Sequence, residues 1–436
     1  MLVLLTLVLA AIMWIRPRLI IPLFIAVSLW INQDLRAGPL TMLMSLSVIV
    51  ICIYFFNPRY FRFSTSNDLV VFNYFKFFII AHIPFIFLSS QFSITANLNS
   101  VKSSLLNIPF LVVLWKCNVK DANLKAYFNI INVAILLMLL YGVFCYVSNA
   151  NPYMSFMSAY SASDNYDDKI LMTMEDARGM LKGRIMCTAT YPIQYAILIA
   201  ITFFLYLKLL PYQRSKYINY MFILLLGVNI YLTGSRGPIV GLALGLILCY
   251  SKLWPLKKLL LYIFFFSYVY LCMCVVVPDS LNGVLSLFQN ENMGGSSTTL
   301  RLKQMASSMS MALDSWQSLL FGHGLGYASY YISKFGHWNV WGFEGILNSG
   351  IVNYGICGLI VFFVINSFFL FFIVKSFYAK KLISKRSYCV LLGLLMCRIV
   401  YLLLVGGSYD RFFLIVYFMI IKISLVETRG FQYDRC

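Results

Sequence analysis

Long apolar stretches separated by short polar turns form the main pattern of this chain. The sequence lacks the alternation of about ten residues that marks strands of a membrane barrel, so the stretches predict helices. A transmembrane helix needs about 20 predominantly apolar residues, which makes the first, second and fifth stretches marginal. We therefore expect an all-α protein with twelve or thirteen membrane spans. The candidates lie near residues 1–15, 19–32, 40–56, 69–89, 101–115, 126–148, 192–210, 217–233, 237–251, 256–277, 349–374, 387–405 and 409–426.

Two polar segments interrupt this pattern, at residues 149–191 and 279–348. The chain shows no internal repeat and no Gly/Ser linker, so we expect one transmembrane domain over residues 1–436 that carries both segments as loops. Such a long loop indicates a function in water at the membrane face, and a passive cap is the alternative. The longer loop holds titratable residues of the kinds found in active sites, namely Arg301, Lys303, Asp314, His323, His337 and Glu344.

Composition supports the membrane class, because 61% of the residues are hydrophobic and only 11% are charged. Soluble domains carry about 25% charged residues. Most of the 11 cysteines lie within apolar spans, where they act as small hydrophobic residues. No disulfide framework is predicted, and the scattered Cys and His residues show no metal-ligand spacing. We expect a polytopic integral membrane protein with neither a metal nor a cofactor.

The positive charges predict the orientation of the chain in the membrane. Of the 34 Lys and Arg residues, 21 fall in one set of alternate loops, which we assign to the cytoplasm because cytoplasmic loops retain positive charge. This assignment puts both long loops, 149–191 and 279–348, on the outer face. The net charge of +19 is then mostly a signal of topology, and we expect no nucleic-acid partner.

The turn in YLTGSRGPIVG, residues 231–241, carries the first candidate chemistry. A Gly-Ser-Arg-Gly-Pro turn joins two apolar stretches on the outer face and places Arg236 at the N-terminus of the second helix. Unpaired backbone N–H groups and the helix dipole favour an anion there, and a guanidinium adds a bidentate fork that suits phosphate. The alternative is an ordinary helix hairpin with a snorkelling arginine.

Three more arginines could share that surface. Arg178 and Arg184 flank a Gly-rich stretch before the span at 192–210, and Arg301 follows the polar run GGSSTTL. Each alone is most simply a solvated charge. Together with Arg236 they suggest a positive cluster of the kind that a diphosphate-linked lipid requires.

A further arginine, Arg398, lies near the middle of the predicted span 387–405. Placing it there costs roughly 2.5–3.5 kcal/mol, so it needs an internal partner or a water-filled cavity. Asp410 is twelve residues away, or about 18 Å along a helix. We expect Asp410 to pair with Arg411 or with an outer-loop arginine instead.

Several short motifs, taken in order, resemble the O-antigen polymerase and O-antigen ligase superfamily of bacterial envelope glycosyltransferases. Each motif is short, so the specificity lies in their order and in the many-span architecture. The ordered matches run from about residue 178 to residue 360. They are the Gly-Arg segment GRIMCTATYP, the Ser-Arg-Gly turn LTGSRGPIVGLALG, the Ser/Thr-rich lead SSTTLRLKQM, the turn LLFGHGLG and the Gly-punctuated helix GILNSGIVNYGICGL.

The resemblance implies a GT-C-like enzyme of the bacterial inner membrane whose active site faces the periplasm. Such an enzyme transfers a growing glycan from undecaprenyl diphosphate to a sugar hydroxyl without a metal. It implies membrane lipid and a lipid-diphosphate-linked glycan as partners, with a chain-length regulator protein as a further one. Ligases tend to show a His-Asn pair close before the Gly-punctuated helix. Here HWN at residues 337–339 lies further upstream, which favours a polymerase and keeps a ligase as the alternative.

The site residues follow from this reaction. Preplaced arginines can stabilise the charge of the departing diphosphate, and Glu344 or His337 could accept the proton of the attacking hydroxyl. Glu344 could instead stabilise a helix N-terminus. His337 could belong to a packed loop or to a platform on which sugars stack. His323 is a further candidate, for which a structural role is the alternative. A polysaccharide flippase or exporter is the alternative from another class, although the absent repeat and the outward titratable residues favour an enzyme.

Overall fold

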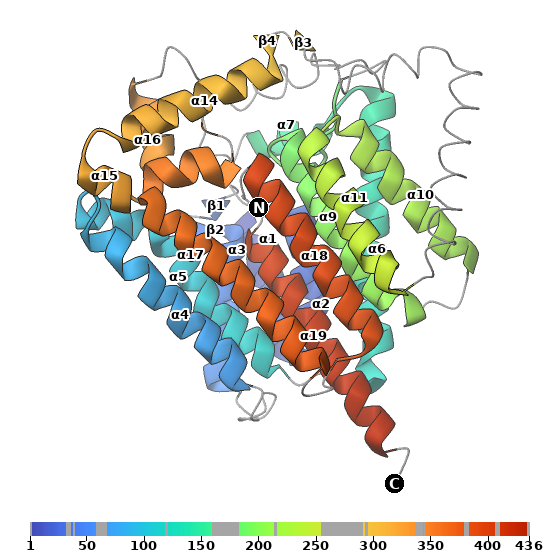
Figure 1. Cartoon of the computed structure of the whole chain (residues 1–436). Helices are drawn as coiled ribbons and strands as arrows, with labels where there is room; N and C mark the ends of the chain where they lie inside the picture. Colours follow the sequence, from blue (N-terminus) through green and yellow to red (C-terminus); the bar gives the residue numbers. More distant parts are fainter. Residues whose placement is uncertain are drawn as a thin grey trace.

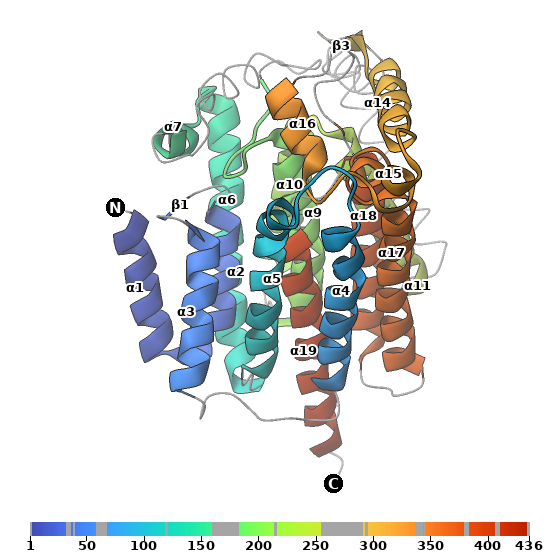
Figure 2. The same ribbon diagram turned by 90° about the vertical axis from the view of Figure 1, so that its left-hand side faces the viewer.

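The computed structural model of the chain describes residues 2–31, 36–37, 40–57, 68–117, 121–158, 183–212, 216–253, 291–292, 295–335, 343, 345–378, 383–405 and 410–433. Most of these residues belong to helices that run side by side in a bundle (Figure 1). Figure 2 shows α14 and α16 at one end of this bundle and the C-terminus at the other. We call these the loop end and the C-terminal end.

The elements confirm the expected all-α class. The strands among the described residues form two short pairs: β1 (Arg36–Ala37) with β2 (Leu40–Thr41), and β3 (Glu291–Asn292) with β4 (Gly295–Ser296). Short 3-10 turns cover Pro17–Leu19 and Leu210–Tyr212. The helices are α1 (Leu2–Ile15), α2 (Ile20–Trp30), α3 (Met42–Phe56), α4 (Asp68–Phe87), α5 (Ile94–Lys116), α6 (Asp121–Ser148), α7 (Pro152–Ser158), α9 (Pro192–Leu209), α10 (Lys216–Leu232), α11 (Arg236–Leu253), α14 (Ser297–Ala312), α15 (Trp316–Phe321), α16 (Tyr327–Phe335), α17 (Gly345–Tyr378), α18 (Lys385–Leu404) and α19 (Asp410–Tyr433).

Each predicted span except 256–277 coincides with one of these helices, and residues 256–277 lie outside the described ranges. Among the described residues, four helices are long and apolar enough to cross a membrane: α6 from Leu124 onward, α9, α17 and α18. The pair α1 and α2 passes the same criterion only together and is bent by 114° at its break. The protein is a multi-pass membrane protein, and the expected number of twelve or thirteen spans stays a prediction.

Helices α9 and α17 occupy opposite environments. In α9, 89% of the most apolar window is buried inside the protein, whereas the figure for α17 is 28%. Apolar residues on a helix surface that other helices do not cover must face lipid in a spanning segment. Helix α9 is therefore part of the core, and α17 lies at the periphery of the bundle.

Helices α11 and α18 approach each other through glycines. A Cβ built on Gly245 would lie 2.5 Å from the carbonyl oxygen of Gly393, and a Cβ on Gly393 would lie 2.6 Å from the carbonyl oxygen of Gly245. Gly241 and Gly237 continue this face of α11 at four-residue spacing, and a Cβ on Gly237 would meet Val405 at 2.6 Å. Small residues allow such close packing between membrane helices. This contact fixes where the first residue of α11 lies.

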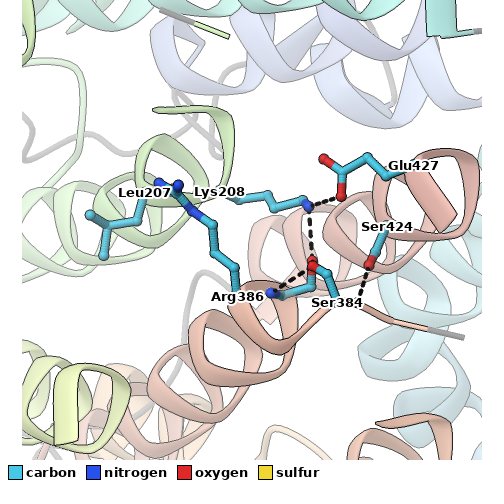
Figure 3. Close-up of polar contacts among 7 residues, drawn as sticks. Leu207, Lys208, Ser384, Arg386, Ser424 and Glu427 are labelled. Carbon is cyan, nitrogen blue, oxygen red and sulfur yellow. Dashed lines mark hydrogen bonds and ion pairs between the residues drawn. The ribbon is translucent and has the colours of Figure 1, made fainter. Parts of the chain in front are cut away.

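A polar cluster ties α9, α18 and α19 together toward the C-terminal end (Figure 3). The Nζ of Lys208 lies 2.5 Å from Oε2 of Glu427 and donates a 2.8 Å hydrogen bond to Oγ of Ser387. Arg386 donates to the carbonyl oxygen of Leu207 at 2.7 Å. The Lys208 side chain is buried, so an ion pair with a second hydrogen bond is what makes this charge tolerable inside the protein.

Helix α17 contains a break at Gly355, whose φ of 63° and ψ of −163° are not helical. The segment that precedes α16 fills the break: His323 N–H donates to the carbonyl oxygen of Val352 at 2.8 Å, and Gly324 N–H donates to that of Asn353 at 3.3 Å. A Cβ on Gly355 would lie 2.6 Å from the carbonyl oxygen of Leu319. Glycine is therefore required here by both conformation and space.

Replacing Gly355 with alanine should destabilise the protein. Backbone strain alone costs about 1–3 kcal/mol, and the contact with Leu319 adds to it. Thermal unfolding of the purified variant in detergent, followed by circular dichroism, measures the effect. Gly227→Ala in α10 is the matched control, because a Cβ there meets nothing within 4 Å and alanine favours a helix. An equal melting temperature for the two variants would contradict this account of the break.

Candidate functional site

The turn between α10 and α11 is rigid and buried. Gly234 has a φ of 57°, in the left-handed region that glycine accepts without strain. The Thr233 hydroxyl donates to the carbonyl oxygen of Ile230 at 2.7 Å and accepts the Ser235 N–H at 3.3 Å. Thr233 and Ser235 are both nearly inaccessible. The turn therefore presents the next residue, Arg236, in a fixed position at the N-terminus of α11.

Arg184 clamps this turn from outside the hairpin. Its Nε donates to the carbonyl oxygen of Thr233 at 2.7 Å, and its Nη2 donates to Oγ of Ser235 at 2.9 Å. The neighbouring Ile185 N–H donates to the carbonyl oxygen of Leu232 at 3.1 Å. Arg184 is only 6% exposed, whereas Arg236 is partly exposed. The guanidinium of Arg184 thus positions the turn, and Arg236 is the more accessible of the two.

The segment that carries Arg184, residues 183–190, is non-helical and buried throughout. Other helices hold it in place: the Thr188 hydroxyl donates to the carbonyl oxygen of Leu29 at 2.8 Å, and Asn151 donates to that of Cys187 at 2.9 Å. Cys187 has a φ of 47°, and burial raises the pKa of its thiol. Irregular backbone near a membrane is tolerated where protein surrounds it, as here.

Helix α17 begins close to the same place as α11. A Cβ on Gly345, the first residue of α17, would lie 2.5 Å from the carbonyl oxygen of Leu403. A Cβ on Gly237 in α11 would lie 3.5 Å from Cβ of Leu404. Both helices therefore start at the last turn of α18. Glu344 directly precedes Gly345 in the chain.

The other predicted site residues of the two loops are placed only in part. Arg178, His337 and Glu344 lie outside the described residues. Arg301 is in α14, and the structure describes its backbone alone. Of the four predicted diphosphate-binding arginines, the structure thus brings Arg184 and Arg236 to one turn, and the roles of all four stay predictions.

His323 is packed between three parts of the chain. Its Nδ1 lies 3.1 Å from Oγ of Ser90, and its Nε2 lies 2.8 Å from the carbonyl oxygen of Met311. The Tyr327 ring stacks on the imidazole at 4.9 Å, and burial raises the pKa of that tyrosine. With 2% exposure and both ring nitrogens engaged, His323 has the contacts of a structural residue. A catalytic role for it stays a prediction.

Arg398 in α18 and Arg411 in α19 have internal partners. Arg398 donates from Nη1 to Oδ1 of Asn366 at 2.6 Å, and its guanidinium lies 4.7 Å from the centre of the Phe413 ring. This is the internal partner that a charge inside a span was expected to need. Arg411 donates to the carbonyl oxygen of Leu43 at 3.0 Å and to Oγ of Ser47. The expected pairing of Arg411 with Asp410 stays a prediction, since the side chain of Asp410 is not described.

Sequence reasoning missed the clamp by Arg184. Its partners are a backbone carbonyl and a serine hydroxyl about 50 positions further along the chain, and neither has a pattern of its own. The sequence showed only the Gly-Arg motif, from which we predicted that Arg184 binds the substrate diphosphate. Among the described residues, no group of three or more His, Cys, Asp and Glu could hold a metal ion.

Comparison with known families fits this geometry. Residues 221–363 match a family model described as O-antigen ligase. This O-antigen-ligase-like domain supports the resemblance of the chain to the O-antigen polymerase and ligase superfamily. Members of the matched family are glycosyltransferase-like enzymes. The matched range contains the turn before α11 and the start of α17, whereas Arg184 precedes it. No curated protein matches the chain.

Proposed function

We propose that this protein is an O-antigen polymerase that joins undecaprenyl-diphosphate-linked repeat units on the periplasmic face of the inner membrane. The observation that carries the proposal is the common starting point of α11 and α17 at the last turn of α18. It places Arg236, the N-terminus of α11 and the start of α17 at the same end of α18. The transfer of a glycan from a lipid diphosphate to a hydroxyl needs groups of these kinds.

In the proposed reaction, a sugar hydroxyl of the acceptor attacks the anomeric carbon of the donor glycan. A new glycosidic C–O bond forms as the C–O bond to the diphosphate breaks, and undecaprenyl diphosphate leaves with the bonding electron pair. Its developing negative charge lies against Arg236 and the first N–H groups of α11. Fixed donors of this kind stabilise such charge without reorganising during the reaction. Arg184 acts as a positioning residue, because it holds Thr233 and Ser235 directly before Arg236.

The proton of the attacking hydroxyl needs an acceptor. Glu344 is our first choice, because it directly precedes α17 in the chain and the next residue packs against Leu403 of α18. His337 is the second choice, seven residues earlier in the same loop. The arginines and the base together account for the transfer without a metal. The proposed periplasmic location rests on the charge distribution of the short loops.

An O-antigen ligase is the second candidate function, since the description of the matched family favours it. A ligase uses the same lipid-diphosphate donor and differs in the acceptor, which is the lipid A core. The charge-stabilising groups serve both reactions equally. The upstream position of HWN at residues 337–339 is the feature that favours a polymerase.

Lipopolysaccharide from a strain that lacks the protein separates the two reactions. Loss of a polymerase should leave lipid A core that carries one repeat unit, whereas loss of a ligase should leave core alone. Gel electrophoresis resolves these products by size. We expect core plus one repeat, restored to long chains by the full chain on a plasmid. Purified protein that moves lipid-linked repeats across vesicles but forms no new glycosidic bond would contradict an enzyme and favour a flippase.

Arg236 should be required for chain growth in that complementation assay. Loss of a preplaced donor to developing charge typically costs about 10²–10³-fold in rate. Arg236→Lys should also fail, because lysine lacks the bidentate fork. Lys334→Ala is the matched control, since Lys334 is an exposed cation in α16, outside the turn that carries Arg236. Long chains made by Arg236→Ala at normal membrane level would show that Arg236 is only a snorkelling residue.

Glu344→Gln tests the proton acceptor separately. Glutamine keeps the shape and hydrogen bonding of glutamate but does not accept the proton, so turnover should fall by about 10²–10⁴-fold. Turnover of purified protein on lipid-linked repeats measures the loss, and binding of the lipid substrate should be largely retained. Near-normal turnover in Glu344→Gln, together with an inactive His337→Ala, would transfer the role to His337.

A further inference from the structure

Helix α14 has its polar and apolar faces reversed relative to an ordinary surface helix. The residues packed toward the bundle are small or polar: Gln304 is 2% exposed and Ser308 is 1% exposed. The opposite face carries Leu302, 63% exposed, and Met305, 57% exposed. A helix in water places its apolar stripe against the protein and its polar residues outside. The outer face of α14 therefore requires a covering that is not water.

Exposed apolar residues also follow the end of α14 in the chain. Met309, Leu313, Trp316 and Leu320 follow Met305 at intervals of three or four residues, and all four are exposed. Trp316 at the start of α15 is 72% exposed. We define the α14–α15 stripe as Leu302, Met305, Met309, Leu313, Trp316 and Leu320. Contiguous exposed apolar surface of this kind marks a contact with a membrane or a partner protein.

The break in α17 gives the depth of this stripe in the membrane. The part of α17 from Ile356 to Tyr378 would be about 34 Å long at 1.5 Å per residue, close to the roughly 30 Å thickness of the hydrocarbon core. The lipid boundary at the loop end therefore lies near Gly355. The backbone of Leu319 and Leu320 in α15 lies directly against Gly355. The stripe thus begins at the level where the bilayer ends.

The stripe is also continuous with the lipid-facing side of α17. Ile356, next to the break, is 40% exposed, and Ile360, one turn further into the bilayer, is 57% exposed. Leu320, whose backbone lies against Gly355, is exposed where this surface begins, and exposed Trp316 lies four residues before it in α15. A tryptophan at this depth suits the aromatic belt of a membrane interface. Lys303, exposed at the flank of α14, suits an anionic headgroup.

We propose that the α14–α15 stripe lies in the interfacial layer of the membrane leaflet at the loop end, in contact with phospholipid. Leu302, Met305 and Met309 then occupy the boundary between headgroups and acyl chains, while Ser308 and Gln304 face the bundle. This contact holds the second half of the long loop at the depth of lipid headgroups. It does not depend on which of the two transfer reactions the protein performs.

Photo-crosslinking in nanodiscs tests this contact. p-Benzoylphenylalanine is placed at Met305 or Trp316 in the full chain, and the protein is reconstituted in phosphatidylethanolamine and phosphatidylglycerol. Mass spectrometry after illumination then detects phospholipid adducts. We expect several-fold more lipid adduct at these positions than at Ser310, which is exposed on the polar flank of the same helix.

Two results would overturn the proposal. A crosslinked dimer as the main product at Met305 and Trp316 would show that a second copy of the chain covers the stripe. Lipid adducts no more abundant than at Ser310 would show that the stripe faces water. Because all three positions are exposed, the probe should leave the fold intact, and an unchanged elution volume in gel filtration checks this for each variant.

Discussion

The close contact between α11 and α18 is the interaction on which the candidate site depends. Lipid is as apolar as the helix surfaces, so helices in a bilayer associate through close packing rather than through the hydrophobic effect. Gly245 and Gly393 allow this packing, because each leaves room for the backbone oxygen of the other. The same face of α11 continues through Gly237 to the end of α18. Larger residues would push the helices apart and move Arg236 away from the start of α17.

Several buried charged residues of the described bundle are held at junctions between helices. Lys208 joins α9 to α19 through Glu427, and Arg398 joins α18 to α17 through Asn366. The Nζ of Lys422 in α19 donates to the carbonyl oxygen of Leu114, near the end of α5. Such buried pairs are weak evidence of net stability, because desolvation offsets much of the attraction. Breaking one leaves an uncompensated charge, so these contacts select one arrangement of helices over others.

The sequence predicted the helices well and their contacts poorly. Spans follow from the local density of apolar residues, which lipid imposes on each segment separately, and every predicted span that the structure describes is helical. The need of Arg398 for an internal partner was also predictable, because it follows from burial alone. That this partner is Asn366 was not predictable, because the sequence does not show toward which helix a polar residue on another span points. The break at Gly355 was missed for the same reason: its cause is the segment around Leu319, which packs against it.

For the candidate site, the sequence predicted the turn at Arg236 but not that α11 and α17 both start at the last turn of α18. Each N-terminus carries a partial positive charge of about half an elementary charge. Adding the guanidinium groups of Arg184 and Arg236 at the turn concentrates positive charge where the surroundings are partly buried. Under the proposed reaction, the diphosphate gains negative charge as its bond to the glycan breaks. The attraction is then stronger in the transition state than in the bound substrate, and this difference, rather than tight binding, accelerates the transfer.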